Sequence, residues 1–348
     1  MQNNSFIKQA EDFRRFAFIK ASGGLNLIPQ AVEKDWWVTA ILRAIYSLEY
    51  GPELQFKGGT SLSKCWNMIF RFSEDIDLAI NPNILGFGEN LSKSQVSNRL
   101  RREGKTFICG RFTEDLIASL RNSGIPVDQL RISNNDNGIP TQDPMQIYIE
   151  YPSLFPEDTY IAPRIILKIT GRANTTGLDE RAVTALVYDY LPKDSVVDIP
   201  VLVTTTQPRR TFIEKVCLLH EEFNKNHGEI RSNRMSRHLY DLYMMCSKGV
   251  DKLVLEDEEI FKRIIHHRFI YNRIDGVDYN TETPGHFAII PPGESLKQWE
   301  QDYRNTIAKM IYGEDRPDFG TIIARIRKLN EDLNAMRWKE GPVFNPGK

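Results

Sequence analysis

Residues 54–64 have the sequence LQFKGGTSLSK, and residues 75–80 have the sequence DIDLAI. The first begins as a short alternating run and reaches a Gly-Gly turn, after which residues 61–69 can form a helix. The second alternates polar and apolar residues with a period of two, which is typical of a strand with one buried face. The order strand, glycine turn, helix, strand predicts an α/β core built on this segment.

Asp75 and Asp77 are two residues apart in the second predicted strand. Side chains at this spacing project from the same face, about 7 Å apart. Two such carboxylates suit Mg²⁺, which binds a few carboxylate oxygens together with substrate phosphates, and a pair of metal ions can hold both reacting oxygens of a phosphoryl transfer. A solvated strand face can carry the same pattern, so the pair alone leaves both interpretations open.

The turn at Gly58, Gly59, Thr60 and Ser61 lies between the first predicted strand and the helix. Backbone N–H groups at the start of a helix favour a phosphate, and the two hydroxyls can donate to its oxygens. A Gly-Gly turn is usually only a turn. Here, however, the acidic pair opens the next strand, so both features can lie at the same end of an antiparallel or mixed sheet. This arrangement predicts a nucleotidyltransferase active site.

Composition limits the alternatives. The chain has 348 residues, with 45 Lys and Arg against 46 Asp and Glu, which excludes a globally basic protein that coats nucleic acid. Its length favours two domains, or one domain with a large appendage. The four cysteines form no CxxC motif and have no histidine at metal-ligand spacing, so neither a disulfide framework nor a zinc site is predicted. Without a signal-like N-terminus or a long apolar run, we expect a cytoplasmic protein that does not enter a membrane.

The sequence pattern changes near Thr206 from one that predicts both strands and helices to one that predicts helices, and we place a domain boundary there. Before it, the patterns predict helices at 6–21, 29–48 and 92–123, and strands at 145–151, 161–170 and 196–204. After it, they predict only helices, at 211–226, 235–247, 258–270, 296–311 and 319–336.

The runs FKGGTSLSK (56–64) and RFSEDIDL (71–78) resemble the first two motifs of the AbiEii/AbiGii nucleotidyltransferase-like toxins. The run EKDWWVT (33–39) resembles the N-terminal helix of that family, Glu214-Lys215 its third motif and RHLYDL (237–242) its fourth. The resemblance covers about residues 30–330 in order and spacing. It implies a polymerase-beta-like nucleotidyltransferase domain with a mixed sheet at residues 1–205, and a helical C-terminal domain at 206–348.

The resemblance also implies an activity and its residues. The protein would be the toxin of a type IV toxin–antitoxin or abortive-infection pair, with a cognate antitoxin as partner. With Mg²⁺ it would transfer a nucleoside monophosphate from an NTP to RNA, most plausibly to the 3′ end of tRNA. Asp75 and Asp77 would bind the metal, and Lys215 and Asp241 would complete the catalytic set. The residues that would bind the nucleotide are Gly58, Gly59, Thr60, Ser61 and Lys64.

Several residues have a second interpretation. Lys215 lies away from the apolar stripe of its predicted helix and is free to reach a triphosphate, although an exposed helical lysine is usually a solubilising charge. Asp241 shares a predicted helix face with Arg234 and can instead be a local partner of Arg237. A third metal carboxylate is often found in the family where this chain has Lys168, and Glu150 in the neighbouring predicted strand can substitute for it or lie at the surface.

Lys168 is the feature that favours a rival function, a binding or regulatory protein that keeps the scaffold without turnover. An intact acidic pair beside an intact glycine turn favours catalysis instead. A further alternative is transfer of the nucleotide to a protein hydroxyl or a small molecule. The composition does not distinguish these acceptors.

Overall fold

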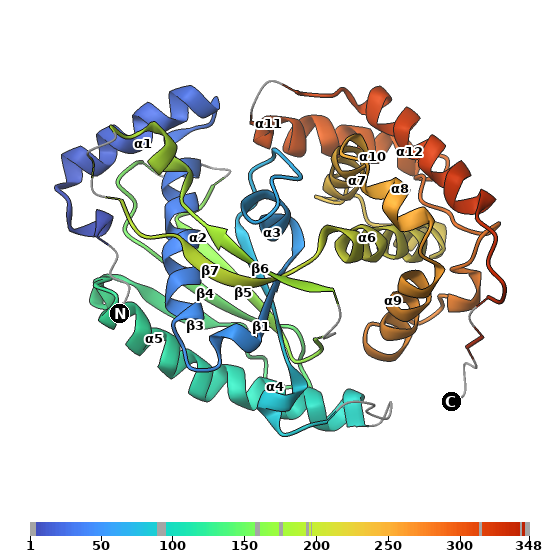
Figure 1. Ribbon diagram of the computed structural model, residues 1–348, viewed down its shortest axis with the longest axis horizontal. Coiled ribbons are helices and arrows are strands. Elements are labelled where there is room, and N and C mark those ends of the chain that lie inside the picture. Colours follow the sequence, from blue (N-terminus) through green and yellow to red (C-terminus); the bar gives the residue numbers. More distant parts are fainter. Residues whose placement is uncertain are drawn as a thin grey trace. The chain divides into compact units, whose positions relative to one another are not determined.

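The computed structural model describes residues 5–88, 95–156, 161–173, 177–192, 195, 197–312, 315–341 and 343–344. The chain divides into two compact units. The first contains residues 1–66 and 72–206, and the second contains residues 67–71 and 207–348 (Figure 1). The segment 67–71 therefore leaves the first unit between the glycine turn and the acidic pair, an excursion that the sequence pattern did not indicate.

A mixed sheet forms the centre of the described part of the first unit (Figure 1). It has seven strands in the order β3-β4-β5-β2-β1-β7-β6. The β1–β2, β3–β4, β4–β5 and β6–β7 pairs are antiparallel, whereas β2–β5 and β1–β7 are parallel. The prediction of a mixed α/β sheet is confirmed. The strands are β1 (Leu54–Lys57), β2 (Asp75–Ile80), β3 (Arg131–Asn134), β4 (Met145–Glu150), β5 (Arg164–Thr170), β6 (Leu178–Val183) and β7 (Val201–Thr206).

One face of this sheet is buried against helices. The side chains of Leu78 on β2 and Leu167 on β5 are fully buried in one core with residues of α1, α2 and α5. Helix α2 is buried from Ala31 to Ile45 on all sides, which is typical of a core helix. The helices of this unit are α1 (Glu11–Leu25), α2 (Pro29–Tyr46), α3 (Gly58–Lys64), α4 (Arg101–Phe107) and α5 (Thr113–Asn122).

The pattern around the glycine turn predicted β1 and β2 closely, but the end of the helix between them was wrong. Helix α3 ends at Lys64 rather than continuing to residue 69, because Asn67 has a left-handed φ of 49° and the chain then enters the second unit. The helix predicted at 92–123 begins outside the described residues, and from Gln95 to Asn122 the chain is helical.

Two strands were missed because they lie at the edges of the sheet. The β6 strand carries Asp179, Glu180 and Arg181, and β3 is exposed along most of its length. Charged side chains on edge strands discourage pairing with other chains, and they also remove the apolar alternation by which a strand is recognised.

Within the described residues of the second unit, the regular elements are helices, apart from an isolated bridge between Arg71 and Ile311. This agrees with the pattern predicted beyond Thr206. Arg234 has a φ of 59° and precedes α7, so its predicted place on one helical face with Asp241 is wrong. The short helix α8 was not predicted. The helices are α6 (Pro208–Phe223), α7 (Arg237–Ser247), α8 (Val250–Leu255), α9 (Glu258–Tyr271), α10 (Ser295–Asp302), α11 (Ala308–Met310) and α12 (Phe319–Ala335).

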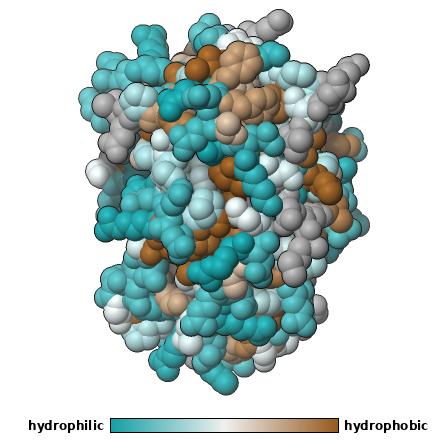
Figure 2. Space-filling view, turned by 90° about the vertical axis from the view of Figure 1, so that its left-hand side faces the viewer, coloured by the Kyte–Doolittle hydropathy of each residue, from teal (hydrophilic) through white to brown (hydrophobic). Residues whose placement is uncertain are grey.

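No helix in the described residues is long and apolar enough to cross a lipid bilayer. On the face that Figure 2 presents, apolar side chains are interspersed among hydrophilic ones. Such scattered exposure is ordinary for a protein surface and marks no site by itself.

A buried carboxyl group in the second unit gives its stability a specific pH dependence. Glu282 is fully buried, near the Glu221 carboxylate that Arg268 binds at 2.7 Å. Burial, and then repulsion from Glu221, raises the pKa of Glu282 to about 8. Between its ordinary pKa and this value the folded protein holds a proton that the unfolded chain has lost. The free energy of unfolding should therefore fall by about 1.4 kcal/mol per pH unit as the pH rises through this range.

Glu282→Gln should remove this contribution, because the amide keeps the shape of the protonated carboxyl group and does not titrate. Urea unfolding at pH 5.0 and pH 7.5 should show the variant gaining stability relative to the parent protein at the higher pH. An equal difference between the two proteins at both pH values would show that Glu282 does not retain its proton in the folded state.

Candidate active site

The acidic pair lies on the face of β2 opposite the buried core. Asp75 and Asp77 are partly exposed, whereas Ile76 and Leu78 between and after them are fully buried. Asp77 is paired in register with Lys57, the last residue of β1, directly before the glycine turn. The turn and the acidic pair therefore lie at the same edge of the sheet, and this predicted proximity is confirmed.

The hydroxyl groups of the turn hold it in place. Thr60 Oγ1 donates to the carbonyl of Asp75 at 2.5 Å, and Ser61 Oγ donates to the carbonyl of Gly58 at 3.1 Å. Both side chains are buried. Because these hydroxyl protons are used within the protein, the groups of the turn that suit a phosphate are the N–H groups at the start of α3, which have no intrahelical acceptor.

The backbone of the turn touches the second carboxylate. Gly58 has a φ of 82°, and a Cβ atom at this position would lie 2.3 Å from Asp77 Oδ2. Only glycine fits, both because of the backbone conformation and because of the close approach. Gly58 thus sets how closely the turn and the Asp77 carboxylate approach each other.

Gly58→Ala should therefore displace the Asp77 carboxylate. We expect NTP affinity in Mg²⁺, measured by calorimetry, to fall at least 10-fold, in addition to about 1 kcal/mol of lost stability from the positive φ. Gly86→Ala is the matched control, because Gly86 has a φ of 75° with no atom within 4 Å of the added Cβ. Equal stability losses with unchanged affinity in both variants would mean that the contact with Asp77 has no role in binding.

Lys168 occupies the position where an acidic residue was expected. It is paired in register with Asp77 across the parallel β2–β5 ladder, and its ammonium group forms an ion pair with Asp75 Oδ2. Glu150 lies two strands from β2, roughly 10 Å away, and its carboxylate is 3.9 Å from Arg131. Glu150 is thus a surface residue rather than a third ligand. The described residues contain no cluster of three or more His, Cys, Asp or Glu side chains that could hold a metal.

Helix α2 carries three consecutive charged residues, two of which form ion pairs with residues of the two motifs. Glu33, Lys34 and Asp35 are all buried. Lys34 Nζ is 2.7 Å from a carboxylate oxygen of Glu74, the residue before Asp75, and Asp35 Oδ1 is 2.5 Å from Nζ of Lys64 at the end of α3. Burial of charged groups is costly unless each has a partner. Lys34 and Asp35 form ion pairs, and Glu33 accepts hydrogen bonds from the Ser153 hydroxyl and the Leu154 N–H. Successive charges in an otherwise apolar helix are the sequence signal that could have revealed these contacts.

This pairing bears on Lys64, for which nucleotide binding was predicted. Its side chain is 5% exposed and Asp35 holds its ammonium group. The ion pair with Asp35 gives Lys64 a structural role that does not depend on a bound nucleotide. Its nucleotide-binding role stays a prediction.

The second unit contains a separate buried ion cluster. Lys215 on α6 and Asp241 on α7 are 7% and 0% exposed, and Lys215 Nζ is 2.8 Å from Asp241 Oδ2. Arg71 binds the same carboxylate through two atoms, Nε at 2.7 Å from Oδ1 and Nη2 at 2.8 Å from Oδ2. The expectation of an exposed Lys215 was wrong, and Asp241 is buried rather than exposed.

The charges in this cluster shift one another's ionisation. Burial opposes the charge on Asp241, but the Arg71 and Lys215 cations outweigh burial and hold its pKa below the usual range. Burial lowers the pKa of Lys215, Asp241 raises it and Arg71 lowers it further. Burial and the neighbouring cations also lower the pKa of His238 far below its usual value, so its neutral Nδ1 can accept from Lys215 Nζ at 3.4 Å.

The structure brings together residues of the first unit at one site and residues of the second unit at another. Asp75 and Asp77 lie beside the glycine turn, whereas Lys215 and Asp241 form an ion pair with each other. Sequence reasoning missed Arg71, although it is the first residue of the quoted second motif. The meeting of the two groups in one active site stays a prediction.

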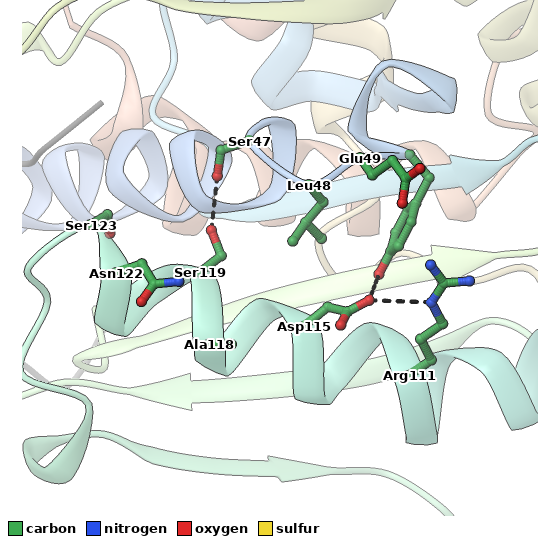
Figure 3. Close-up of a pocket in the computed structure, with 10 residues that line it drawn as sticks. Ser47, Leu48, Glu49, Arg111, Asp115, Ala118, Ser119, Asn122 and Ser123 are labelled. Carbon is green, nitrogen blue, oxygen red and sulfur yellow. Dashed lines mark hydrogen bonds and ion pairs between the residues drawn. The ribbon is translucent and has the colours of Figure 1, made fainter. Parts of the chain in front are cut away.

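A pocket of about 370 Å³ lies elsewhere in the first unit, between the end of α2 and α5 (Figure 3). In it, the Tyr50 hydroxyl donates to Asp115 at 2.9 Å. Arg111 lies 3.4 Å from the same carboxylate (Figure 3). None of the residues predicted to act on a nucleotide lines this pocket. It is therefore distinct from the candidate active site.

Comparison with known proteins gives the family. Residues 40–325 match the family model described as nucleotidyl transferase AbiEii toxin, type IV TA system. The solved structure of MenT4, nucleotidyltransferase toxin Rv2826c from Mycobacterium tuberculosis H37Rv, is 15% identical, with a TM-score of 0.48 and coverage of 94% of this chain and 91% of that one. JHP933 from Helicobacter pylori is 14% identical, with a TM-score of 0.32 and coverage of 88% and 97%. No curated protein matches the sequence. Because the family model spans most of the chain, this protein belongs to the AbiEii family of nucleotidyltransferase toxins of type IV toxin–antitoxin systems.

Proposed function

We propose that this nucleotidyltransferase uses Mg²⁺ to transfer a nucleoside monophosphate from an NTP to RNA, with the 3′ end of tRNA as the acceptor. The observation that carries the proposal is the contact between the turn at Gly58 and the Asp77 carboxylate, with Asp75 on the same strand face. Phosphate-binding N–H groups and metal-binding carboxylates at one edge suit a metal–triphosphate unit.

The donor set fits the proposed metal. Mg²⁺ is commonly bound by one or two carboxylates together with water and substrate phosphates, so Asp75 and Asp77 suffice without a third acid. The bound metal would polarise phosphoryl oxygens and stabilise the charge that develops on them. Lys168, which now pairs with Asp75, would stand beside the triphosphate and supply a further cation.

The remaining residues would bind and orient the nucleotide. The N–H groups of Gly59, Thr60 and Ser61 would donate to phosphate oxygens, with the Thr60 and Ser61 hydroxyls fixing the turn. Lys64 would act on the nucleotide from the end of α3, where Asp35 holds it. In this proposal the residues of the turn bind and orient the triphosphate and take no part in bond making or bond breaking.

In the proposed reaction, the Lys215 ammonium group would neutralise charge on the departing pyrophosphate, and Asp241 would orient it. Their ion pair at 2.8 Å supports these roles. Phosphoryl transfer is catalysed mainly by positioning and electrostatic stabilisation, so no covalent protein nucleophile is required. The acceptor hydroxyl would release its proton to solvent and attack the α-phosphorus, while the bond from that phosphorus to the bridging oxygen breaks and pyrophosphate leaves.

The family implies an antitoxin as the partner and a nucleotide as a substrate. The RNA acceptor rests on the resemblance of the motifs rather than on a described surface. A second candidate function is nucleotide binding without turnover. The observation that favours it is Lys168, which stands where a third acidic residue was expected.

The decisive experiment incubates the purified protein with each α-labelled NTP, Mg²⁺ and total RNA, and compares intact tRNA with tRNA whose 3′ diol has been oxidised by periodate. We expect label on intact tRNA, with none after oxidation or with EDTA. Label on protein or on a small molecule would replace the proposed acceptor. NTP binding without any transfer would favour the non-catalytic function.

A further inference from the structure

The segment 67–71 is firmly held within the second unit. Arg71 forms an isolated antiparallel bridge with Ile311, and the Tyr312 N–H donates to the carbonyl of Phe70 at 2.8 Å. In the sequence, the segment follows the glycine turn and ends four residues before Asp75. The position of Arg71 is thus fixed by the fold of the second unit, although it belongs to the motif that contains the acidic pair.

Arg71 binds the Asp241 carboxylate through two hydrogen bonds. Its guanidinium group binds both carboxylate oxygens, at 2.7 and 2.8 Å, with Arg71 5% exposed and Asp241 fully buried. A two-point contact of this kind fixes the plane of a carboxylate as well as its position. The oxygen that accepts from Nη2 is also the one that binds Lys215, so the orientation of the lysine depends on Arg71 through Asp241.

We propose that Arg71 is a positioning residue for the transfer reaction, fixing Asp241 so that one of its oxygens orients the Lys215 ammonium group. This inference rests on the proposed function, in which Lys215 acts on the pyrophosphate. This role of Arg71 differs from the metal binding proposed for the acidic pair and from the phosphate binding proposed for the glycine turn. It also explains why the segment between the two motifs packs into the helical unit.

The charges around Lys215 make this role measurable. Asp241 and His238 contact its ammonium group, and Arg71 and Arg237 act on it from further away. Burial lowers the pKa of Lys215, and the Arg71 cation lowers it further, while Asp241 raises it. Loss of the Arg71 cation should therefore raise the pKa of Lys215. Loss of an arginine that stabilises the fold without acting on Lys215 would change the amount of active protein but not this pKa.

The test compares kcat and KM for NTP as functions of pH in the parent protein, Arg71→Gln and Arg71→Lys. We expect Arg71→Gln to lower kcat at least 100-fold and to move the alkaline limb of the profile to higher pH. Arg71→Lys should recover at least 10-fold of this loss and return the limb toward its original position, because it restores the charge without the two-point contact.

Arg268→Gln is the matched control, because Arg268 in the same unit binds both oxygens of the buried Glu221 carboxylate. It should destabilise the fold and leave the pH profile unchanged. If Arg71→Gln loses no more activity than Arg268→Gln and keeps the original profile, Arg71 is structural and the inference fails, while the proposed function stands. If Arg71→Gln does not fold, the same comparison with Arg71→Lys decides.

An activity-independent measurement separates this inference from the proposed function. The pKa of Lys215 can be followed by NMR of ¹³C-labelled lysine, with Lys215→Met to assign the signal. A raised pKa in Arg71→Gln supports the control of Lys215 by Arg71 even where no acceptor is modified. An unchanged pKa overturns it. Absence of transfer by the parent protein to every acceptor would instead refute the proposed function.

Discussion

Asp75→Ala and Asp77→Ala should each lower nucleotide transfer at least about 1,000-fold. Each removes one of two carboxylates proposed to hold the metal, whose charge stabilisation amounts to several kcal/mol in the transition state, and each 1.4 kcal/mol is a factor of ten in rate. The measurement is the initial rate of label transfer from an α-labelled NTP. The loss should appear in kcat as well as in KM, because the proposed metal would act on the reacting phosphoryl group.

The same variants should remain folded. The Asp75–Lys168 ion pair is partly exposed, with 15% and 29% of the two side chains accessible, and pairs of this kind stabilise a protein by less than about 1 kcal/mol. Urea unfolding should therefore change little. Glu150→Ala is the matched control, an acid on the same sheet that pairs with Arg131. Retention of a tenth of the activity by either aspartate variant would remove both residues from the metal site.

The central part of the candidate site could be predicted because it is local in sequence. The strand–turn–helix–strand order places Gly58 and Asp77 at one sheet edge once β1 and β2 are antiparallel. Two-residue periodicity was enough to put Asp75 and Asp77 on the same face. The contact between the Gly58 backbone and the Asp77 carboxylate was not predicted, but it agrees with the register, which pairs Lys57 with Asp77.

The ion cluster could not be predicted in the same way, because its members are distant in sequence. Arg71 and Asp241 are 170 positions apart, and no local pattern relates them. Lys215 lies outside the apolar stripe of α6, and helical periodicity therefore predicts that its side chain is exposed. It is buried because Asp241 compensates its charge, and a partner on another helix leaves no trace in the spacing of a single helix.

Lys168 shows what a departure from a family pattern means in three dimensions. The sequence indicated only that an acid was replaced, whereas the register puts the lysine opposite Asp77 and its ammonium group against Asp75. A cation there would compete with a metal in the absence of nucleotide. With a triphosphate bound, it would have phosphate oxygens as alternative partners, so the replacement is compatible with turnover.

The second large effect is expected in the ion cluster, where activity and stability should separate. Lys215→Met should lower transfer at least about 100-fold, because the proposed countercharge for the pyrophosphate is lost. Its effect on stability should be small, since Asp241 keeps Arg71 as a buried partner. Asp241→Asn should lower activity too, but it leaves Arg71 and Lys215 buried beside each other without a shared carboxylate. Leaving buried charges without a compensating partner costs about 3–5 kcal/mol of unfolding free energy.

The double variant Lys215→Met/Asp241→Asn distinguishes the two contributions. In it, one of the two cations that faced the lost carboxylate is gone, so urea unfolding should recover part of the stability that Asp241→Asn loses. Transfer should not recover, because Lys215 is the residue proposed to act on the phosphates and Asp241 only orients it. If activity returned along with stability, the single Asp241 variant would have been inactive merely because it was unfolded, and the catalytic role of Lys215 would be excluded. A stable double variant without transfer would leave positioning of the Lys215 ammonium group as the function of the cluster.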